Sequence, residues 1–242
     1  MTKNLLIILI LLAACKNIYS MEYTIMTEEL VPLSYMEDNK LKGASVEIVQ
    51  KMLKKLKIIV KIGIYPWARA YHNIQVKPRH ILFSMGRTHK REKMFKWVGP
   101  IINTKVFFYK HADSNLKIEN LNDAKKVGTI LVSRNFPEHM LLERKGFKNL
   151  YITTSSSKNF RMLAGKRGDL VPNIEFTTMP ILKKNNIDPQ LIKKTKYVIS
   201  HLSLYIAMSK DTPDSVVRKW QKVFEEVKNS PFYRKTLKKY IP

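Results

Sequence analysis

The sequence predicts an α/β protein built on mainly parallel sheets. Three observations indicate this class. Short runs rich in β-branched and aromatic residues alternate with segments of helical periodicity along the chain. Within the helical segments, apolar residues recur at spacings of three and four. Several of these segments start with a proline or a cap-forming residue, which a helix start favours.

In the first half of the chain the pattern predicts four strands and two helices. The strands lie at 23–27, 58–64, 81–85 and 106–109. A loop over 30–42, with a proline and an Asp-Asn turn signal, separates the first strand from the first helix. That helix follows Gly43, and its apolar face is Val46, Val49, Met52, Leu53 and Leu56. Pro66 opens the second helix.

The second half continues the alternation. Strands are predicted at 127–132, 150–153, 169–173 and 203–208. A helix over 135–145 is closed by Gly146, and another is capped within 155–157. A short helix covers 180–185. Thr212-Pro213 and Ser230-Pro231 begin the last two helices.

The first twenty residues have the three parts of a secretory signal peptide. Lys3 is followed by the apolar run 5–12 and then by small residues. The run is shorter than the ~20 residues of a spanning helix. We expect export with cleavage after Ser20. Cleavage before Cys15, which ends a lipobox-like Leu-Ala-Ala-Cys, would instead give a lipoprotein, and a buried N-terminal element is the remaining alternative.

Composition limits the class further. Cys15 is the only cysteine, so the exported chain has no disulfide and depends on core burial. Removing residues 1–20 leaves 222 of 242 residues, enough for one large domain or two lobes. The net charge of +25 suits an anionic partner or ligand, yet the lysines are spread along helix faces, which favours a solvated surface.

The sequence offers little for catalysis. Its six histidines are scattered without metal-ligand spacing, and it has no nucleophile elbow, P-loop or dinucleotide fingerprint. We therefore expect no metal, no cofactor and no enzymatic activity. Nucleic-acid binding is disfavoured by the signal peptide and by the lack of a helix-turn-helix.

The stretch 84–100 carries the most chemical information. A strand stops at Gly86, a polar turn with two arginines follows, and an aromatic pair precedes Gly-Pro. The carboxyl end of a strand in an α/β sheet is where ligands bind, and a guanidinium matches a carboxylate through two hydrogen bonds. This stretch predicts an anion site, with an ordinary basic loop as the alternative. Trp67 and Arg69 flank a strand-to-helix turn and are expected to line the cleft that holds this anion site.

The run 83–101 resembles the pattern Thr-x-x-Arg-x-x-x-x-x-[Phe/Trp]-x-x-Pro of the bacterial periplasmic solute-binding family 3. Here Thr88, Arg91, Trp97 and Pro100 occupy its defined positions. Four further segments are similar to parts of that family in the same order, so the resemblance covers nearly all of 21–242. These segments are 27–35 followed by Gly43, 65–70, 165–169 and 205–209.

The resemblance implies a two-lobed, type II periplasmic-binding-protein-like fold whose lobes close on ligand. Each lobe is expected to be a mainly parallel sheet flanked by helices, joined to the other by two crossing strands near 101–109 and 201–208. The implied boundaries are 1–20 for the signal peptide, 21–104 with 203–242 for the first lobe, and 105–202 for the second.

The resemblance also implies site residues. Arg91 matches the arginine that clamps a ligand carboxylate, and Ser84 and Gly86 match strand-end contact positions. Ser133, Arg134 and Asn135 match a second-lobe turn, and Glu28 matches an acid near the ligand ammonium in some members. Two departures put an ordinary α-amino acid in doubt. Leu30 or Val31 stands where an aromatic is usual, and the second-lobe acid after Asp169 has no clear counterpart among 173–175.

These features predict a monomeric periplasmic protein that captures a small, carboxylate-bearing solute, an amino acid or related compound, for an inner-membrane ABC permease. The alternatives are an enzyme on the same fold, such as a cyclohexadienyl dehydratase-like lyase, with Glu28 as the acid, and a sensory ligand-binding protein.

Overall fold

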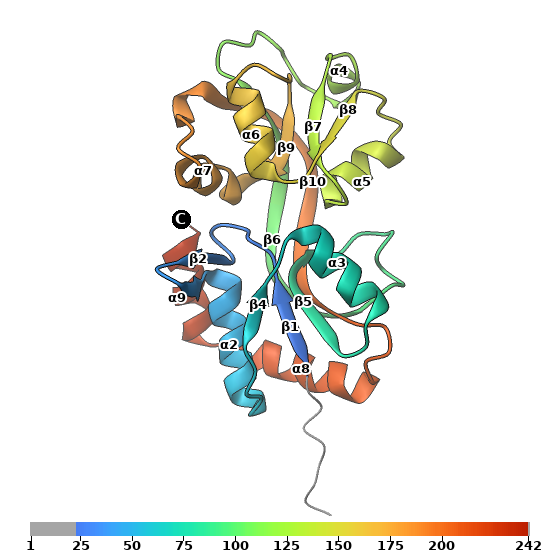
Figure 1. Cartoon of the computed structure of the whole chain (residues 1–242), viewed down its shortest axis with the longest axis vertical. Coiled ribbons are helices and arrows are strands. Elements are labelled where there is room, and N and C mark those ends of the chain that lie inside the picture. The colour runs from blue at the N-terminus through green and yellow to red at the C-terminus, as the bar shows by residue number, and fades with distance from the viewer. Residues whose placement is uncertain (1–22, 242) are drawn as a thin grey trace, which may run out of the picture.

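Two long strands organise the protein. In the computed structural model, which describes residues 23–241, β6 (Lys96–His111) and β10 (Ile192–Met208) pair antiparallel along most of their length. They run from the lower group of elements in Figure 1 to the upper group, and the two groups form two lobes. The predicted crossings near 101–109 and 201–208 lie within these strands. The predicted signal peptide and Cys15 lie outside the described residues.

The main sheet has six strands in the order β4-β1-β5-β10-β6-β9. Its remaining strands are β1 (Thr24–Thr27), β4 (Ile62–Ile64), β5 (His80–Gly86) and β9 (Val171–Ile174). β1 pairs parallel with β4 and β5. In the second group, β7 (Ile130–Ser133) and β8 (Leu150–Thr153) pair parallel with each other. The crossing strands pair antiparallel with their neighbours, β10 with β5 and β6 with β9. The predicted α/β class and two-lobed architecture are confirmed. The residue limits of the lobes stay a prediction.

Helices cover both faces of each lobe. The elements around β1, β4 and β5 are called the first lobe here, and those around β7, β8 and β9 the second lobe. The first lobe carries α2 (Ala44–Leu56), α3 (Trp67–Val76), α8 (Asp214–Lys228) and α9 (Pro231–Tyr240). The second carries α4 (Leu121–Lys125), α5 (Pro137–Arg144), α6 (Ser156–Ala164), α7 (Glu175–Lys184) and the 3₁₀ turn η1 (Pro189–Leu191).

The apolar face predicted for α2 is the one that is buried. All five of its predicted core residues pack into one cluster with Trp220, Phe224 and Val227 of α8. Each such side chain contributes about 1.5–3 kcal/mol by leaving water. α3 packs on the opposite face of the sheet, in a separate cluster with Met26 and Leu82. The first lobe is thus a sheet between two helical layers.

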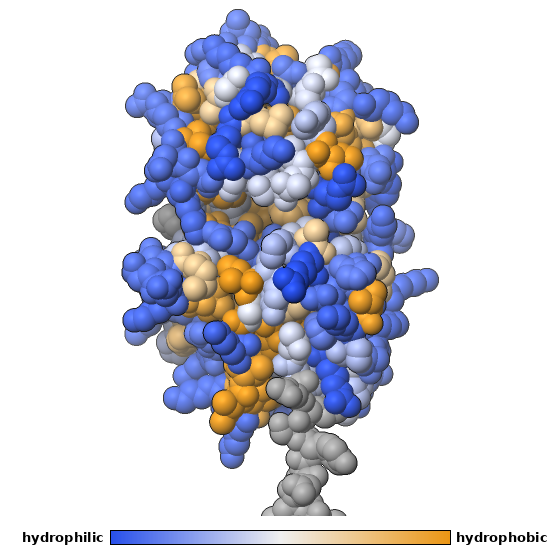
Figure 2. All heavy atoms as spheres, in the orientation of Figure 1, coloured by the Kyte–Doolittle hydropathy of each residue, from blue (hydrophilic) through white to orange (hydrophobic). Residues whose placement is uncertain are grey.

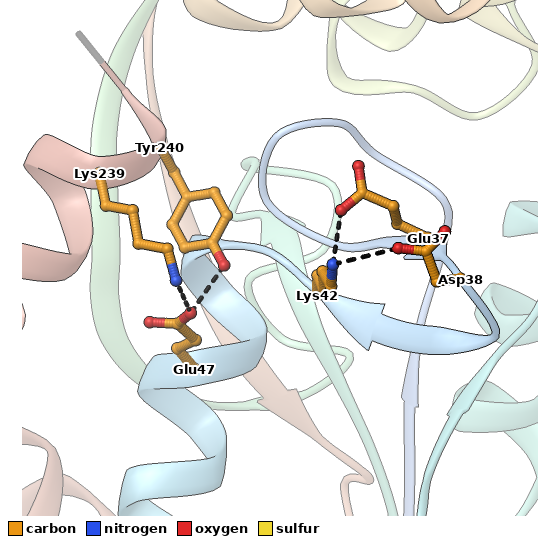
Figure 3. Close-up of polar contacts among 6 residues, drawn as sticks. All are labelled: Glu37, Asp38, Lys42, Glu47, Lys239 and Tyr240. Atoms are coloured by element: carbon orange, nitrogen blue, oxygen red, sulfur yellow. Dashed lines mark hydrogen bonds and ion pairs between the residues drawn. The ribbon is translucent and has the colours of Figure 1, made fainter.

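Helices α2 and α9 are joined in the first lobe. Figure 3 shows Glu47 of α2 accepting hydrogen bonds from Lys239 Nζ at 2.7 Å and from the Tyr240 hydroxyl at 2.6 Å. The same view shows Lys42 Nζ 2.6 Å from Glu37 in a hairpin of β2 (Tyr35–Glu37) and β3 (Lys40–Lys42). Helix α9 is therefore fixed to α2.

Two local predictions were wrong, and one helix was missed. The segment predicted as a loop contains the β2–β3 hairpin, because Asp38 and Asn39 adopt positive φ and form its turn. α4 was not predicted, although Asn120 and Asp123 form a capping box at its start. Thr212 does not cap α8, whose N-cap is Pro213.

α7 also begins five residues earlier than the predicted helix start at Pro180. Proline lacks an amide hydrogen, but the helix accommodates Pro180 in its interior. The Asn173 side chain donates to the hydroxyls of Thr177 and Thr178 and holds the first turn in place. Within residues 23–241 no helix combines the length and the apolar character needed to cross a bilayer.

Candidate functional site

A cleft lies where the two lobes face each other. It has a volume of about 620 Å³, and Figure 2 shows the hollow between the lobes. Its walls come from the loop after β1 and the start of α3 in the first lobe, and from the starts of α5 and α6 and the end of α7 in the second. A second, inner cavity of about 20 Å³ shares Glu28, Leu30, Trp67 and Phe136 with this cleft and lies against β10. The inner cavity is lined by buried charged and polar side chains, among them Arg91, Glu28 and Glu138.

Arg91 lines the inner cavity and is fully buried. Its guanidinium carbon is 4.9 Å from the Trp67 ring centroid and 4.8 Å from that of Tyr71, so two aromatic faces stabilise the charge. Nη1 donates to the Gly86 carbonyl at 2.8 Å, and Nη2 donates to the Asn135 carbonyl of the second lobe at 2.5 Å. Burial lowers the pKa of Arg91, yet a guanidinium stays charged in proteins. A positive charge is therefore held at the contact between the lobes.

The end of β5 shapes the floor of this cavity. Ser84 has a φ of 62°, in a region that residues other than glycine seldom adopt, and it directs a buried hydroxyl toward the cavity. A Cβ on Gly86 would lie 2.6 Å from Cγ of Pro137, the first residue of α5. The absence of a side chain at this position lets the second lobe approach the strand end.

Two carboxyl groups line the same cavity, one from each lobe. Glu28 follows β1 and is fixed by the Ser34 hydroxyl, which donates to the Glu28 carbonyl at 2.7 Å. Glu138 lies in the first turn of α5. Burial raises the pKa of Glu28 to about 8, against the opposing effect of Arg91 and with a further rise from Glu138. Burial likewise raises the pKa of Glu138 to about 7, although its own backbone amide and Arg91 favour the ionised form.

Four buried polar atoms around the cavity have no hydrogen-bond partner among the described residues. They are Arg91 Nε, Trp67 Nε1, Ser84 Oγ and Glu138 Oε2. Buried polar groups are nearly always paired, and leaving one unpaired costs about 1–3 kcal/mol. Two of these atoms are donors, one is an acceptor and the hydroxyl serves as either. The site is therefore prepared for a partner that offers both acceptors and donors.

The structure brings together five of the residues that the sequence predicted for the site. These are Arg91, Ser84, Gly86, Glu28 and Trp67, and all of them line the inner cavity. The other three lie elsewhere. Arg69 is exposed, with its guanidinium 5.6 Å from the Tyr65 ring, and Arg134 is exposed. Ser133 is buried inside the second lobe, where it accepts a hydrogen bond from the Asn159 side chain at 3.2 Å.

The sequence analysis missed Glu138 as a site residue, because the second-lobe acid was sought among 173–175 and not on α5. At those positions Asn173 and Ile174 line the inner cavity, with the Asn173 side chain bonded to α7, whereas Glu175 pairs with Lys194 outside it. Asn135, which the resemblance placed in the second-lobe turn, has a φ of 61°, and its carbonyl accepts a hydrogen bond from Arg91. A Pro-Glu pair at a helix start was the available signal for Glu138.

The residues described contain no group of three or more histidine, cysteine, aspartate and glutamate side chains arranged to hold a metal ion. The polar groups at the inner cavity instead combine one guanidinium with two carboxyls. Such a set binds a small polar molecule by hydrogen bonds and charge.

Residues 23–242 match the family described as bacterial extracellular solute-binding proteins, family 3. The chain belongs to this family. Among curated proteins no sequence matches it. The resemblance that the run 83–101 predicted is thus confirmed at the level of the family, and Arg91 of that run lines the inner cavity.

Solved structures share the fold of this family 3 protein. A histidine kinase sensor domain with similarity to periplasmic binding proteins has a TM-score of 0.81 at 16% identity, covering 90% of this chain and 95% of its own. The substrate-binding protein of an amino acid ABC transporter has a TM-score of 0.75 at 19% identity, with coverages of 90% and 99%. Holo ArgBP from T. maritima has a TM-score of 0.74 at 18% identity, with coverages of 90% and 95%. At these identities the likeness establishes the fold.

Proposed function

We propose that this family 3 protein captures a small, carboxylate-bearing solute, an amino acid or related compound, between its two lobes. We further propose that it acts as a monomer in the periplasm and delivers the solute to an inner-membrane ABC permease. The family description and the transporter protein among its structural neighbours support this role. Binding without turnover is the activity proposed.

The observation that carries the proposal is the buried guanidinium of Arg91 with its unpartnered Nε, set beside the unpartnered Trp67 Nε1 and Ser84 Oγ. A carboxylate offers up to four acceptor positions, so it satisfies several of these donors at once. The aromatic rings keep the guanidinium in place before the solute arrives, which lowers the entropic cost of binding.

Solute entry requires the lobes to move apart. A cavity of about 20 Å³ accommodates roughly one water molecule. An amino acid therefore needs more space between Arg91 and the Asn135 carbonyl, which accepts from that arginine across the lobe boundary. We propose that the solute carboxylate takes the place of this carbonyl and that the lobes close around it.

A thermal-shift screen of the purified protein against amino acids, organic acids and polyamines tests the proposal. Any solute that binds only the folded state raises the free energy of unfolding, by about 2.7 kcal/mol at a hundredfold excess over Kd, and therefore raises Tm. We expect a saturable rise with one or a few carboxylate-bearing compounds. Stabilisation by polyamines alone would contradict the carboxylate preference, and no stabilisation by any compound would contradict the proposed function.

A sensory role is a second candidate, favoured by the sensor domain of a histidine kinase among the structural neighbours. The two roles share the binding step and differ in the receiver. Co-purification with a permease supports transport, whereas co-purification with a kinase supports sensing.

An enzymatic role on this fold rests on Glu28, whose pKa of about 8 keeps the carboxyl protonated at neutral pH, as a proton donor requires. Turnover of prephenate or arogenate by the purified protein, lost in Glu28→Gln, would establish it. Stabilisation by solutes without any turnover favours the binding role.

A further inference from the structure

A separate groove crosses the lobe boundary beside α5. It has a volume of about 430 Å³, which is in the range of small-molecule sites. Its walls are the turn 87–90 after β5 in the first lobe, one side of α5 in the second lobe, and 200–202 of β10 between them. We call it the flank groove. Arg91, Glu28 and Glu138 line the inner cavity and do not line the flank groove.

The wall of the flank groove on the side of α5 and β10 is apolar. Met140 and Leu202 are buried in the protein, and Pro137 and Leu141 are half-buried. Covering such a surface with an apolar group is favourable, by about 25 cal/mol for each Å² removed from water. Methionine also adapts its shape to a bound group. This wall therefore suits the apolar body of a solute.

The rim of the flank groove is basic. Lys90 of the first lobe and Arg144 of the second are exposed, and neither forms an ion pair with a side chain of the described residues. His89 and His201 add further polar groups on the same rim. Among the described residues that line the groove, Glu143 is the one acid. The groove therefore carries an excess of positive charge.

The wall formed by Arg87 is fixed in place. Arg87 donates from Nε and Nη2 to Glu92 at 2.7 Å and 2.5 Å, so its own charge is compensated. Its guanidinium also lies 5.5 Å from the Trp97 ring centroid and 5.1 Å from that of Tyr205. A wall that is already ordered lowers the entropic cost of binding. The charges left for a ligand are those of Lys90 and Arg144.

We infer that the flank groove binds an anionic solute with an apolar body, whose charged group is held between Lys90 and Arg144, and that this solute favours the closed lobes. Closure brings these two like charges, one from each lobe, to the same groove. An anion between them replaces a repulsion with two attractions. The effect on closure rests on the lobe movement of the proposed function, whereas the binding step does not.

A solvated groove with ordinary surface bases is the competing account. Exposed bases attract any anion weakly, whatever the body of that anion, and salt screens the attraction. A site that uses both the apolar wall and the basic rim instead prefers an anion with an apolar body over either part alone. This preference separates the two accounts.

The test titrates octanoate, octanol and acetate into the purified protein and follows binding by ligand-detected NMR at physiological salt. Octanoate has both an apolar body and a charge, octanol lacks the charge, and acetate lacks the body. The charge variant is Lys90→Gln with Arg144→Gln. Lys93→Gln with Lys145→Gln is the matched control, because both lysines are exposed, lie close in sequence to the first pair and do not line the groove. Circular dichroism checks that all variants fold.

We expect saturable binding of octanoate to the wild type, about tenfold or more tighter than binding of octanol or acetate. The charge variant should bind octanoate about tenfold more weakly, because two charged partners are lost. The control pair should match the wild type. Small-angle scattering should show that octanoate lowers the radius of gyration of the wild type and leaves that of the charge variant unchanged.

Equal affinities for octanoate in the charge variant and the wild type, or an equal loss in the control pair, would overturn the site. Acetate binding as tightly as octanoate, or no binding of octanoate, would overturn it as well. Loss of octanoate binding in Arg91→Lys alone would move the probe to the inner cavity, which overturns the inference and leaves the proposed function in place. Octanoate binding without a change in radius of gyration would overturn the effect on closure.

Discussion

Glu28 and Glu29 are adjacent in the chain and meet the second lobe in opposite environments. Glu28 faces the inner cavity, buried beside Arg91, and the neighbouring Glu29 forms an ion pair with Lys184 of α7 at the mouth of the outer cleft. The side chains of that outer pair are 38% and 51% exposed, for Lys184 and Glu29 respectively. Both residues lie where the two lobes face each other, so their difference isolates what burial does to a charge.

Burial makes the inner group, Glu28 with Arg91, sensitive to what occupies the cavity. Water screens the outer pair, which contributes at most about 1 kcal/mol. At the inner contact no solvent compensates a change of charge, so removing one group leaves the others unpaired. The inner group is therefore suited to recognise a solute, whereas the outer pair only weakly stabilises the closed arrangement of the lobes.

Removing the guanidinium is the strongest way to break the inner contact. In Arg91→Ala we expect binding of the carboxylate-bearing solute to weaken by about 2 kcal/mol or more, roughly thirtyfold, because buried acceptors lose a charged donor. Calorimetry on Arg91→Ala and Arg91→Lys measures the effect, with circular dichroism to check folding. Arg134→Ala is the control, since Arg134 is exposed. Affinity equal to wild type in both Arg91 variants would remove Arg91 from the site.

A methyl group at Gly86 tests how closely the lobes must approach. The added Cβ would lie 2.6 Å from the Pro137 ring across the lobe boundary. We expect Gly86→Ala to weaken binding by about 1–3 kcal/mol, the usual cost of overpacking. Gly165→Ala is the matched control, because its Cβ would have only ordinary contacts at 3.5 Å. If calorimetry shows equal affinities in the two variants, the close approach is not needed for binding.

Lobe closure is expected to depend on pH, because the carboxyls of the inner cavity are buried and that of the outer pair is not. The closed arrangement raises the pKa of Glu28 to about 8 and of Glu138 to about 7, from an ordinary value of 4.5. It therefore binds more protons than an open arrangement, and closure is favoured at low pH and lost as pH rises through about 7 to 8. The charge that acts on both carboxyls is that of Arg91, with Tyr71 against its guanidinium, and Glu138 acts in turn on Glu28.

Small-angle scattering of the free protein measures this effect. We expect the radius of gyration to increase between about pH 5 and about pH 9, as the two carboxyls ionise and repel each other. The double variant Glu28→Gln with Glu138→Gln should show no such increase. An increase of the same size in the double variant would assign the pH response to other groups.

Removing the outer pair should have the smallest effect. We expect Lys184→Ala to weaken solute binding by less than about 1 kcal/mol, roughly fivefold, and the loss to shrink at high salt. Lys183→Ala is the control, as Lys183 is exposed on the same helix. A loss as large as that of Arg91→Ala would show that the exposed pair, and not the buried group, holds the lobes together.

Much of the fold was predictable because it depends on local patterns. The buried face of α2 was read from spacings of three and four, and Ser155 caps α6 as expected. The hairpin at β2–β3 and helix α4 were missed because each is short. The two crossing strands were predicted only in part, since their remaining residues gain strand structure by pairing with each other across the lobes.

By itself, the sequence determined the alternation of strands and helices, the family pattern around Arg91 and five residues of the inner cavity. Only the tertiary structure decided that Glu138 lines the same cavity as Glu28, and that Arg69, Ser133 and Arg134 do not line it. The physical reason is distance along the chain. Periodicity and capping act over a few residues, whereas the meeting of two carboxyls from different lobes depends on how β6 and β10 position the lobes and on the space left at Gly86.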